Sequence, residues 1–94
     1  MKTHLYYTYI LTNKNHSVLY VGITNNLKRR IMEHKTKVHK GFTARYNVDA
    51  LIYYEIFTNI HAAIAREKQI KAGSRQKKIE LIERDNKEWR ELMV

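Results

Sequence analysis

The sequence predicts an α+β domain in which two strands, a helix and a third strand precede two further helices and a short last one. Three runs rich in aromatic and β-branched residues predict the strands, and segments with apolar residues three and four positions apart predict the helices. The chain of 94 residues has no proline, no repeat and no linker-like stretch. We therefore expect a single domain over residues 1–94.

Each predicted strand consists almost entirely of aromatic, aliphatic or β-branched residues. The strands are expected over residues 6–11, 18–23 and 50–57. The polar sequence TNKNHS between the first two predicts a turn, and therefore an antiparallel hairpin. A four-residue loop would pair Thr12 with Ser17. In that register Tyr9 lies opposite Tyr20, and both rings point to the same face of the sheet.

Helical periodicity accounts for most of the other apolar residues, and polar residues that can cap a helix mark where each helix begins. The helices are expected over residues 26–35, from 58 or 59 to 72 and from 74 or 75 to 84, with a short last helix that Asp85 or Asn86 can cap. Thr24 or Asn25 is the expected cap of the first helix. The last helix would carry Trp89, Leu92 and Met93 on one face.

The charge of the chain favours a polyanionic partner. Its 18 lysine and arginine residues against 9 acidic residues give a net charge of +9. Nucleic acid is the most abundant polyanion in a cell, so DNA is the expected partner and RNA the second. A structural RNA-binding or ribosome-associated protein would have the same charge. The irregular segment 36–47 mixes charge, glycine and aromatic residues and is expected to be a long surface loop within reach of a substrate.

Seven basic residues are the expected contacts to phosphate groups. They are Lys28, Arg29, Lys35, Lys37, Lys40, Arg45 and Lys71. Any one of them, taken alone, is better explained as a solvated surface residue.

Several classes of protein are excluded by composition. The absence of cysteine excludes a disulfide-linked partner and a thiolate metal site. No apolar run approaches the roughly 20 residues that a membrane-spanning helix needs. The N-terminal sequence MKTHLYYTYIL lacks the small-residue cleavage site of a secretory signal. We therefore expect a cytoplasmic protein that does not bind membranes.

A carboxylate interrupts the apolar face of the helix that precedes Gly73. Apolar residues at helical spacing run from Ile60 to Ile70, and Glu67 lies near the middle of that face. An ionised carboxylate that faces the interior is costly unless a cation or a metal ion meets it. Two interpretations stay open: a metal site, or an ion pair with Arg30 or a lysine. The ion pair is the more common explanation for a lone glutamate.

The first predicted helix places two further polar residues beside the core. Leu27 and Ile31 lie four residues apart and form its buried stripe. Arg30 and His34 each follow a stripe residue by three positions, so both line the border of the buried face.

Together these segments resemble the GIY-YIG nuclease family, in its small single-domain bacterial branch. The sequence YTY that ends at Tyr9 is similar to the first motif of the family. The sequence YVG that begins at Tyr20, eleven residues later, is similar to the second. Arg30 lies ten residues beyond Tyr20, where the family carries an arginine, and Glu67 matches its late-helix glutamate. Asn86 matches a late asparagine of some members.

The resemblance implies a three-stranded antiparallel sheet flanked by helices. It also implies metal-dependent hydrolysis of phosphodiester bonds in DNA, in repair or recombination. Glu67 would hold one Mg²⁺ or Mn²⁺ ion, and Arg30 would stabilise negative charge on the phosphate. Tyr20 or Tyr9 would orient or deprotonate the attacking water. His34 stands where some relatives use a histidine.

This hypothesis requires the two phenols, the guanidinium and the carboxylate to meet in one pocket, because a nearby cation is what would lower a tyrosine pKa. The alternative is a nucleic-acid-binding module that keeps the fold without cleaving its ligand.

Overall fold

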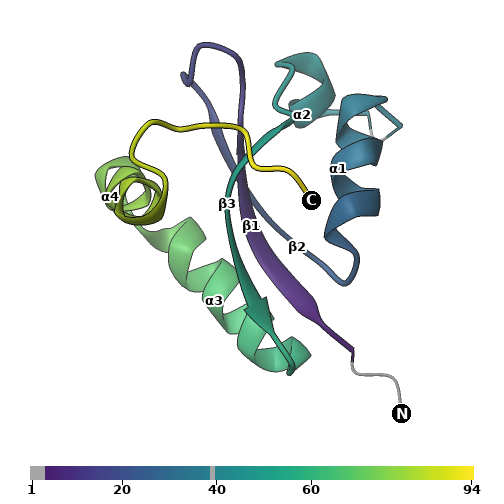
Figure 1. The fold of residues 1–94 in the computed structure, drawn as a ribbon, viewed down its shortest axis with the longest axis vertical. Coiled ribbons are helices and arrows are strands. Elements are labelled where there is room, and N and C mark those ends of the chain that lie inside the picture. Colours follow the sequence, from purple (N-terminus) through teal and green to yellow (C-terminus); the bar gives the residue numbers. More distant parts are fainter. Residues whose placement is uncertain (1–3, 39) are drawn as a thin grey trace.

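A computed structural model, which describes residues 4–38 and 40–94, shows a three-stranded antiparallel sheet between helices (Figure 1). The strands are β1 (Tyr6–Thr12), β2 (Leu19–Thr24) and β3 (Ala50–Phe57), and the helices are α1 (Leu27–Lys35), α2 (Phe42–Arg45), α3 (Ile60–Ala72) and α4 (Arg75–Asp85). β1 is central, and β2 and β3 are the edge strands. The predicted α+β class is confirmed. The domain predicted over residues 1–94 includes residues 1–3 and 39, which lie outside the described ranges.

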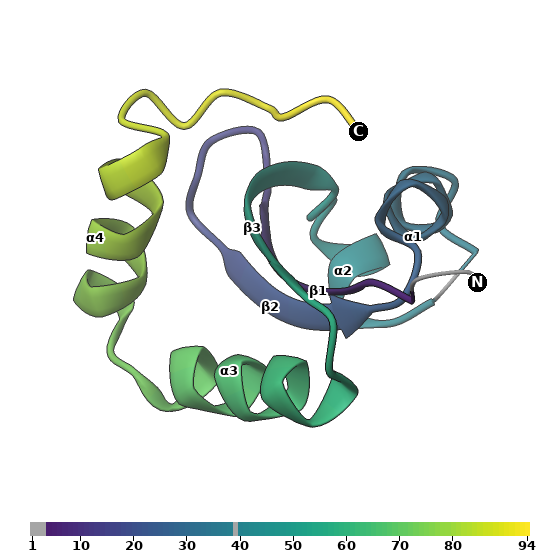
Figure 2. The same ribbon diagram turned by 60° about the horizontal axis from the view of Figure 1, so that its bottom comes forward.

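Each face of the sheet carries its own apolar cluster, because consecutive residues of a strand point to opposite faces. The cluster on the α1 face contains Tyr9, Leu11, Leu27, Ile31, Val48 and Leu51. The cluster on the α3 face contains Ile10, Val21, Ile52, Tyr53, Ile70 and Ile82. Figure 2 shows α1 and α2 on one side of the sheet and α3 on the other. Side chains on α1 and on α3 are therefore separated by the sheet. Within the described ranges, no helix has both the length and the apolar character needed to cross a membrane.

A β-bulge shapes the pairing of β1 with β3. Ile10 pairs with Tyr53 and the next residue of β1 pairs with Leu51, so Ile52 is the extra residue. As a result Ile52 and Tyr53, although consecutive, both pack on the α3 face.

The predicted register of the β1–β2 hairpin is wrong by two residues. Thr12 pairs with Leu19 rather than with Ser17. The side chain of Asn13 explains the longer loop, because its Oδ1 accepts hydrogen bonds from the backbone N–H groups of Ser17 (2.9 Å) and Val18 (3.1 Å). These N–H groups are thereby withdrawn from the strand ladder.

The corrected register keeps the two tyrosines on one face, since a shift of two residues preserves the orientation of every side chain. Tyr9 now lies opposite Gly22, and Tyr20 is its diagonal neighbour, with ring centroids 6.5 Å apart. A Cβ atom on Gly22 would come within 2.5 Å of Cζ and Oη of Tyr9. The second motif therefore has glycine at this position because the Tyr9 ring occupies the space above it.

Polar caps begin the helices much as predicted. Asn59 caps α3 and Ser74 caps α4, each through its side-chain oxygen. The cap of α1 is Asn26, not Thr24 or Asn25. Thr24 instead supports that cap, because its Oγ1 accepts a hydrogen bond from the Asn26 N–H at 3.1 Å.

The segment predicted as a loop, 36–47, contains the helical turn α2. Gly41 precedes it with φ of 128°, a backbone conformation that favours glycine. After α2, the N–H of Val48 donates to the carbonyl of Thr43 at 2.9 Å, and Val48 is fully buried in the α1-face cluster. These contacts fix α2 against the sheet beside α1.

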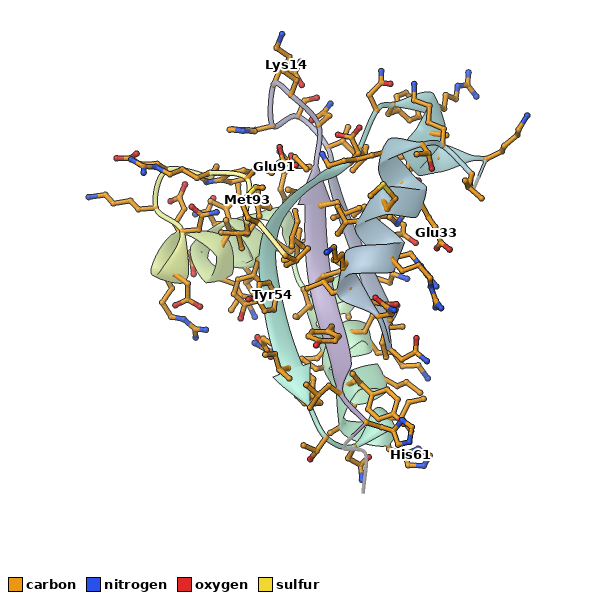
Figure 3. All side chains as sticks on the ribbon, turned by 45° about the vertical axis from the view of Figure 1, so that its right-hand side comes forward. Lys14, Glu33, Tyr54, His61, Glu91 and Met93 are labelled. Atoms are coloured by element: carbon orange, nitrogen blue, oxygen red, sulfur yellow. The ribbon has the colours of Figure 1, made fainter. Side chains whose placement is uncertain are left out.

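The predicted last helix is wrong: the residues after α4 form an extended segment that returns over the sheet (Figure 3, where Glu91 and Met93 mark it). Asn86 holds the turn, because its side chain bonds to both the N–H (2.9 Å) and the carbonyl (2.8 Å) of Arg90. Asn86 also donates to the bulged carbonyl of Ile52 at 3.0 Å. In this structure Asn86 therefore anchors the C-terminal segment.

Candidate functional site

Tyr9 on β1 and His34 on α1 form the buried centre of the candidate site. Tyr9 is 1% exposed and His34 is 7% exposed. Tyr9 Oη lies 3.3 Å from Nε2 of His34, and Nδ1 of the same ring lies 3.1 Å from Oγ1 of Thr43 on α2. Because both ring nitrogens are engaged, the imidazole is oriented between the sheet and α2.

Tyr20 lies over this pair at the surface, with its ring edge-on to His34 at a centroid distance of 5.8 Å. Beside it is a hollow of about 280 Å³. Its walls are formed by Tyr20, Arg30, His34, Lys40, Phe42 and Thr43. Two cations and a phenol thus surround a space open to solvent, whereas Tyr9 lies beneath it.

The side chain of Arg30, which lines this hollow, contains a buried hydrogen-bond donor, the Nε–H group. Its Nε lies 3.2 Å from Oε1 of Glu33, within ion-pair distance, but the N–H does not point at that oxygen. Among the side chains that the structure describes, this Nε–H finds no hydrogen-bond acceptor. The Arg30 side chain has Glu33 at ion-pair distance and interacts with the Tyr9 hydroxyl, so a ligand oxygen in the hollow would be a further acceptor for the Nε–H.

Tyr9 is held in its protonated form. Burial, followed by the neighbouring Tyr20, raises the pKa of Tyr9 to about 12, and the Arg30 guanidinium only partly opposes this rise. The family resemblance allows either Tyr9 or Tyr20 to act on water. The raised pKa and the burial of Tyr9 favour Tyr20 for that role.

Glu67 does not line this hollow. It belongs to α3, which lies on the other side of the sheet from α1, the helix that carries Arg30 (Figure 2). Its side chain is 15% exposed and pairs with Nζ of Lys71 at 3.1 Å. In this structure the partner of Glu67 is therefore a lysine, and the metal site stays a prediction.

Glu67 nevertheless lies alongside the edge strand that carries Tyr20. One turn earlier on α3, Ile64 lines a hollow with Ile23 near the end of β2. One turn later, Ile70 packs in the same cluster as Val21 in the middle of β2. Since Glu67 lies between these two helix positions, it is level with β2, on the opposite face from Tyr20.

The seven predicted phosphate contacts are all exposed, and they are unevenly distributed. Six belong to α1, α2 and the segment between them, namely Lys28, Arg29, Lys35, Lys37, Lys40 and Arg45. The seventh, Lys71, is on α3. Most of the predicted phosphate contacts therefore lie on the α1 side, where Lys40 helps to line the hollow.

Comparison with known proteins identifies the family. Residues 5–80 match the family model described as the GIY-YIG catalytic domain. The chain belongs to the GIY-YIG family. A UPF0213 protein of Clostridium perfringens is 41% identical over 76 residues, which cover 81% of each chain. A UPF0213 protein of Staphylococcus haemolyticus is 37% identical over 78 residues, which cover 83% of this chain and 94% of the relative.

A solved structure supports the same GIY-YIG assignment. The solution NMR structure of a UPF0213 protein from Bacillus halodurans matches this fold with a TM-score of 0.58 at 28% sequence identity. The match covers 90% of this chain and 89% of that one. The predicted family and the predicted fold are thus confirmed, while the names of these relatives state no substrate.

The residues of this GIY-YIG domain fit a metal ion only with help from a substrate. Within the described ranges, no group of three histidine, aspartate or glutamate side chains could hold an ion alone. Mg²⁺ commonly binds through one or two carboxylates, with water and substrate phosphates completing its shell. The single carboxylate of Glu67 fits that pattern, and Lys71 would have to release it.

Sequence reasoning missed three residues of the GIY-YIG site. Thr43 orients His34, Phe42 lines the hollow, and Glu33 faces Arg30. The segment that carries Phe42 and Thr43 has no periodicity, so nothing in it indicated which side chains turn inward. Glu33 follows Arg30 by three positions on a helix, a spacing that does predict contact.

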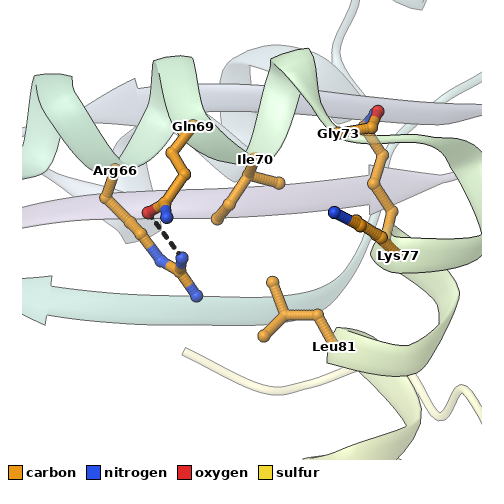
Figure 4. Close-up of a pocket in the computed structure, with 7 residues that line it drawn as sticks. Arg66, Gln69, Ile70, Gly73, Lys77 and Leu81 are labelled. Atoms are coloured by element: carbon orange, nitrogen blue, oxygen red, sulfur yellow. Dashed lines mark hydrogen bonds between the residues drawn. The ribbon is translucent and has the colours of Figure 1, made fainter.

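A second hollow, of about 260 Å³, lies between α3 and α4 on the other side of the sheet (Figure 4). It is lined by Arg66, Gln69, Ile70, Gly73, Lys77, Lys78 and Leu81.

Arg66 has a structural role, because its guanidinium donates hydrogen bonds to both carboxylate oxygens of Glu55 and to Gln69. Burial alone would raise the pKa of Glu55, but bonds from Arg66 and Tyr53 hold it below its ordinary value. Glu55 is therefore a structural carboxylate.

Proposed function

We propose that this GIY-YIG domain hydrolyses phosphodiester bonds in DNA, with RNA as the second candidate substrate. The observation that carries the proposal is the buried Nε–H of Arg30, which has no acceptor among the described side chains and lies beside the hollow that Tyr20 and Lys40 line. A phosphate oxygen would satisfy this donor and would be stabilised by it as charge develops. The predicted role in repair or recombination, in the cytoplasm, belongs to the same proposal.

The buried residues set the geometry of the proposed site. Since the raised pKa keeps Tyr9 protonated, its hydroxyl is able to donate to Nε2 of His34. In the tautomer that accepts this bond, His34 would carry its proton on Nδ1 and donate it to Thr43. Tyr20, packed edge-on against this imidazole, lines the hollow, where its hydroxyl would orient the attacking water.

Glu67 would hold the divalent ion, Mg²⁺ or Mn²⁺, on the other side of β2. When bound, such an ion supplies charge stabilisation at the phosphoryl group and its leaving oxygen. A strand that runs over the edge of β2 would contact Arg30 on one face and Glu67 on the other. β2 is an edge strand, so in the described chain no further strand pairs with its outer side.

One observation favours the binding module as the second candidate. Glu67 is already neutralised by Lys71 and lies across the sheet from Arg30. Without a metal ion at Glu67, the cations of the α1 side would bind nucleic acid and leave it intact.

The test is cleavage of plasmid, single-stranded DNA, branched DNA and RNA with Mg²⁺ or Mn²⁺. We expect the protein to nick or cut at least one of them, and Glu67→Gln to lower that rate by about 100-fold or more, as loss of a metal ligand does. Glu80→Gln, at an exposed site on α4, is the matched control and should cut normally. Circular dichroism checks that both variants fold. Binding without metal-dependent cleavage of any substrate would establish the second candidate instead.

A further inference from the structure

Two aromatic rings stand exposed beside the proposed site. Phe42 is 53% and Tyr46 is 46% exposed, although each could bury a large apolar surface. Their ring centroids are 5.0 Å apart and their planes are tilted by 51°. Phe42 begins the helical turn α2, and Tyr46 directly follows it. Val48, rather than either ring, anchors this segment in the core. About half of each residue is therefore open to a ligand.

The charge around these rings indicates a polyanionic ligand. The guanidinium of Arg45 lies 5.6 Å from the centre of the Tyr46 ring. The segment 36–47 also carries Lys37 and Lys40, and it contains no aspartate or glutamate. Aromatic faces among cations are the composition with which proteins bind unpaired nucleic-acid strands, whose bases stack on the rings while the phosphates meet the cations.

One of the two rings, that of Phe42, lies in the wall of the hollow. Phe42 and Lys40 line it together with Arg30. The neighbour of Phe42, Thr43, bonds to His34 in the buried centre of the site. A base that stacks on Phe42 would therefore be close to a phosphate that binds Arg30.

We infer that Phe42 and Tyr46 form a stacking site for unpaired bases, so that the substrate is a single strand or an unpaired region of a duplex. Bases inside a duplex are already stacked on their neighbours, and only unpaired bases can lie on a protein ring at little cost. This inference rests on the proposed function, because it places the scissile strand in the hollow.

The experiment measures binding in the Glu67→Gln background, so that no ligand is cut during the measurement. The probes are a labelled single-stranded oligonucleotide and a duplex of the same sequence. We expect Phe42→Ala and Tyr46→Ala each to weaken binding of the single strand about 5- to 100-fold, and binding of the duplex less than about twofold. Tyr46→Phe should restore single-strand binding. Ile56→Ala, which removes an exposed apolar side chain of β3, should change neither affinity.

Equal loss of single-strand and duplex binding, unchanged single-strand binding, or no binding of either probe would overturn the stacking site. The proposed catalysis is tested separately by cleavage with Glu67 intact. If the parent protein cuts nothing but Phe42→Ala still loses single-strand binding selectively, the catalysis fails and the stacking site stands. If cleavage occurs and truncating the rings leaves single-strand binding unchanged, the catalysis stands and the stacking site fails.

Discussion

Gly22 and Tyr9 show how one residue of a motif can fix another. A Cβ atom at Gly22 would approach three atoms of the Tyr9 side chain to 2.5–2.7 Å. Tyr9 is buried in the close-packed α1-face cluster, so its ring cannot move aside without disturbing neighbours. We predict that Gly22→Ala lowers the free energy of unfolding by about 1–3 kcal/mol, measured by chemical denaturation. Gly73→Ala, whose Cβ would meet Ile70 O at 3.3 Å, is the control, and an equal loss there would contradict this account.

The tyrosines also give the fold a defined pH dependence. Burial raises the pKa of both Tyr9 and Tyr53 to about 12, with help from Tyr20 and Glu55 respectively. A tyrosine with a raised folded pKa stabilises the fold fully below its unfolded pKa, near 10, and this contribution is lost as the pH rises toward 12.

A phenolate absorbance titration should therefore show two of the seven tyrosines ionising late, and Tyr9→Phe should leave only one. Uniform ionisation near the ordinary value would show that Tyr9 and Tyr53 are not buried as described.

At the scale of the element, the β1–β2 loop depends on a single amide. Asn13 accepts hydrogen bonds from two backbone N–H groups, those of Ser17 and Val18. We predict that Asn13→Ala lowers the free energy of unfolding by about 1–2 kcal/mol, since these donors lose their acceptor. Lys14→Ala, at the exposed tip of the same loop (Figure 3), should change it by less than about 0.5 kcal/mol. Similar values for both variants in urea denaturation would mean that the loop does not depend on Asn13.

The elements that the sequence predicts well are those with a continuous local signal. The bounds of β3 are those predicted, because a β-branched and aromatic run ends on both sides in polar residues. α3 begins at Ile60, directly after the predicted start at Thr58 or Asn59, and Asn59 serves as its cap. The last helix failed for a non-local reason, since Asn86 uses its side chain on Ile52 and Arg90 instead of capping a new helix.

At the scale of the whole molecule, the sequence predicted where Tyr9, Tyr20, Arg30 and His34 lie, but not where Glu67 lies. Tyr9 and Tyr20 share a face in the predicted register and in the observed one, because the two registers differ by an even number of residues, and helix spacing brings Arg30 and His34 to the edge of the same core. The position of Glu67 was not predictable in this way, because a helix that follows an edge strand can cover either face of the sheet. A local periodicity shows that Glu67 interrupts an apolar face but not which face of the sheet that helix covers.

The central claim is that groups from both sides of β2 act on one strand of nucleic acid. NMR of the Mn²⁺-loaded protein with a non-cleavable single strand tests it directly, since a bound paramagnetic ion broadens nearby amide signals. We predict broadening at Glu67 and along β2 from Tyr20 to Ile23, and its loss in Glu67→Gln. Broadening centred elsewhere, or unchanged in that variant, would contradict the claim.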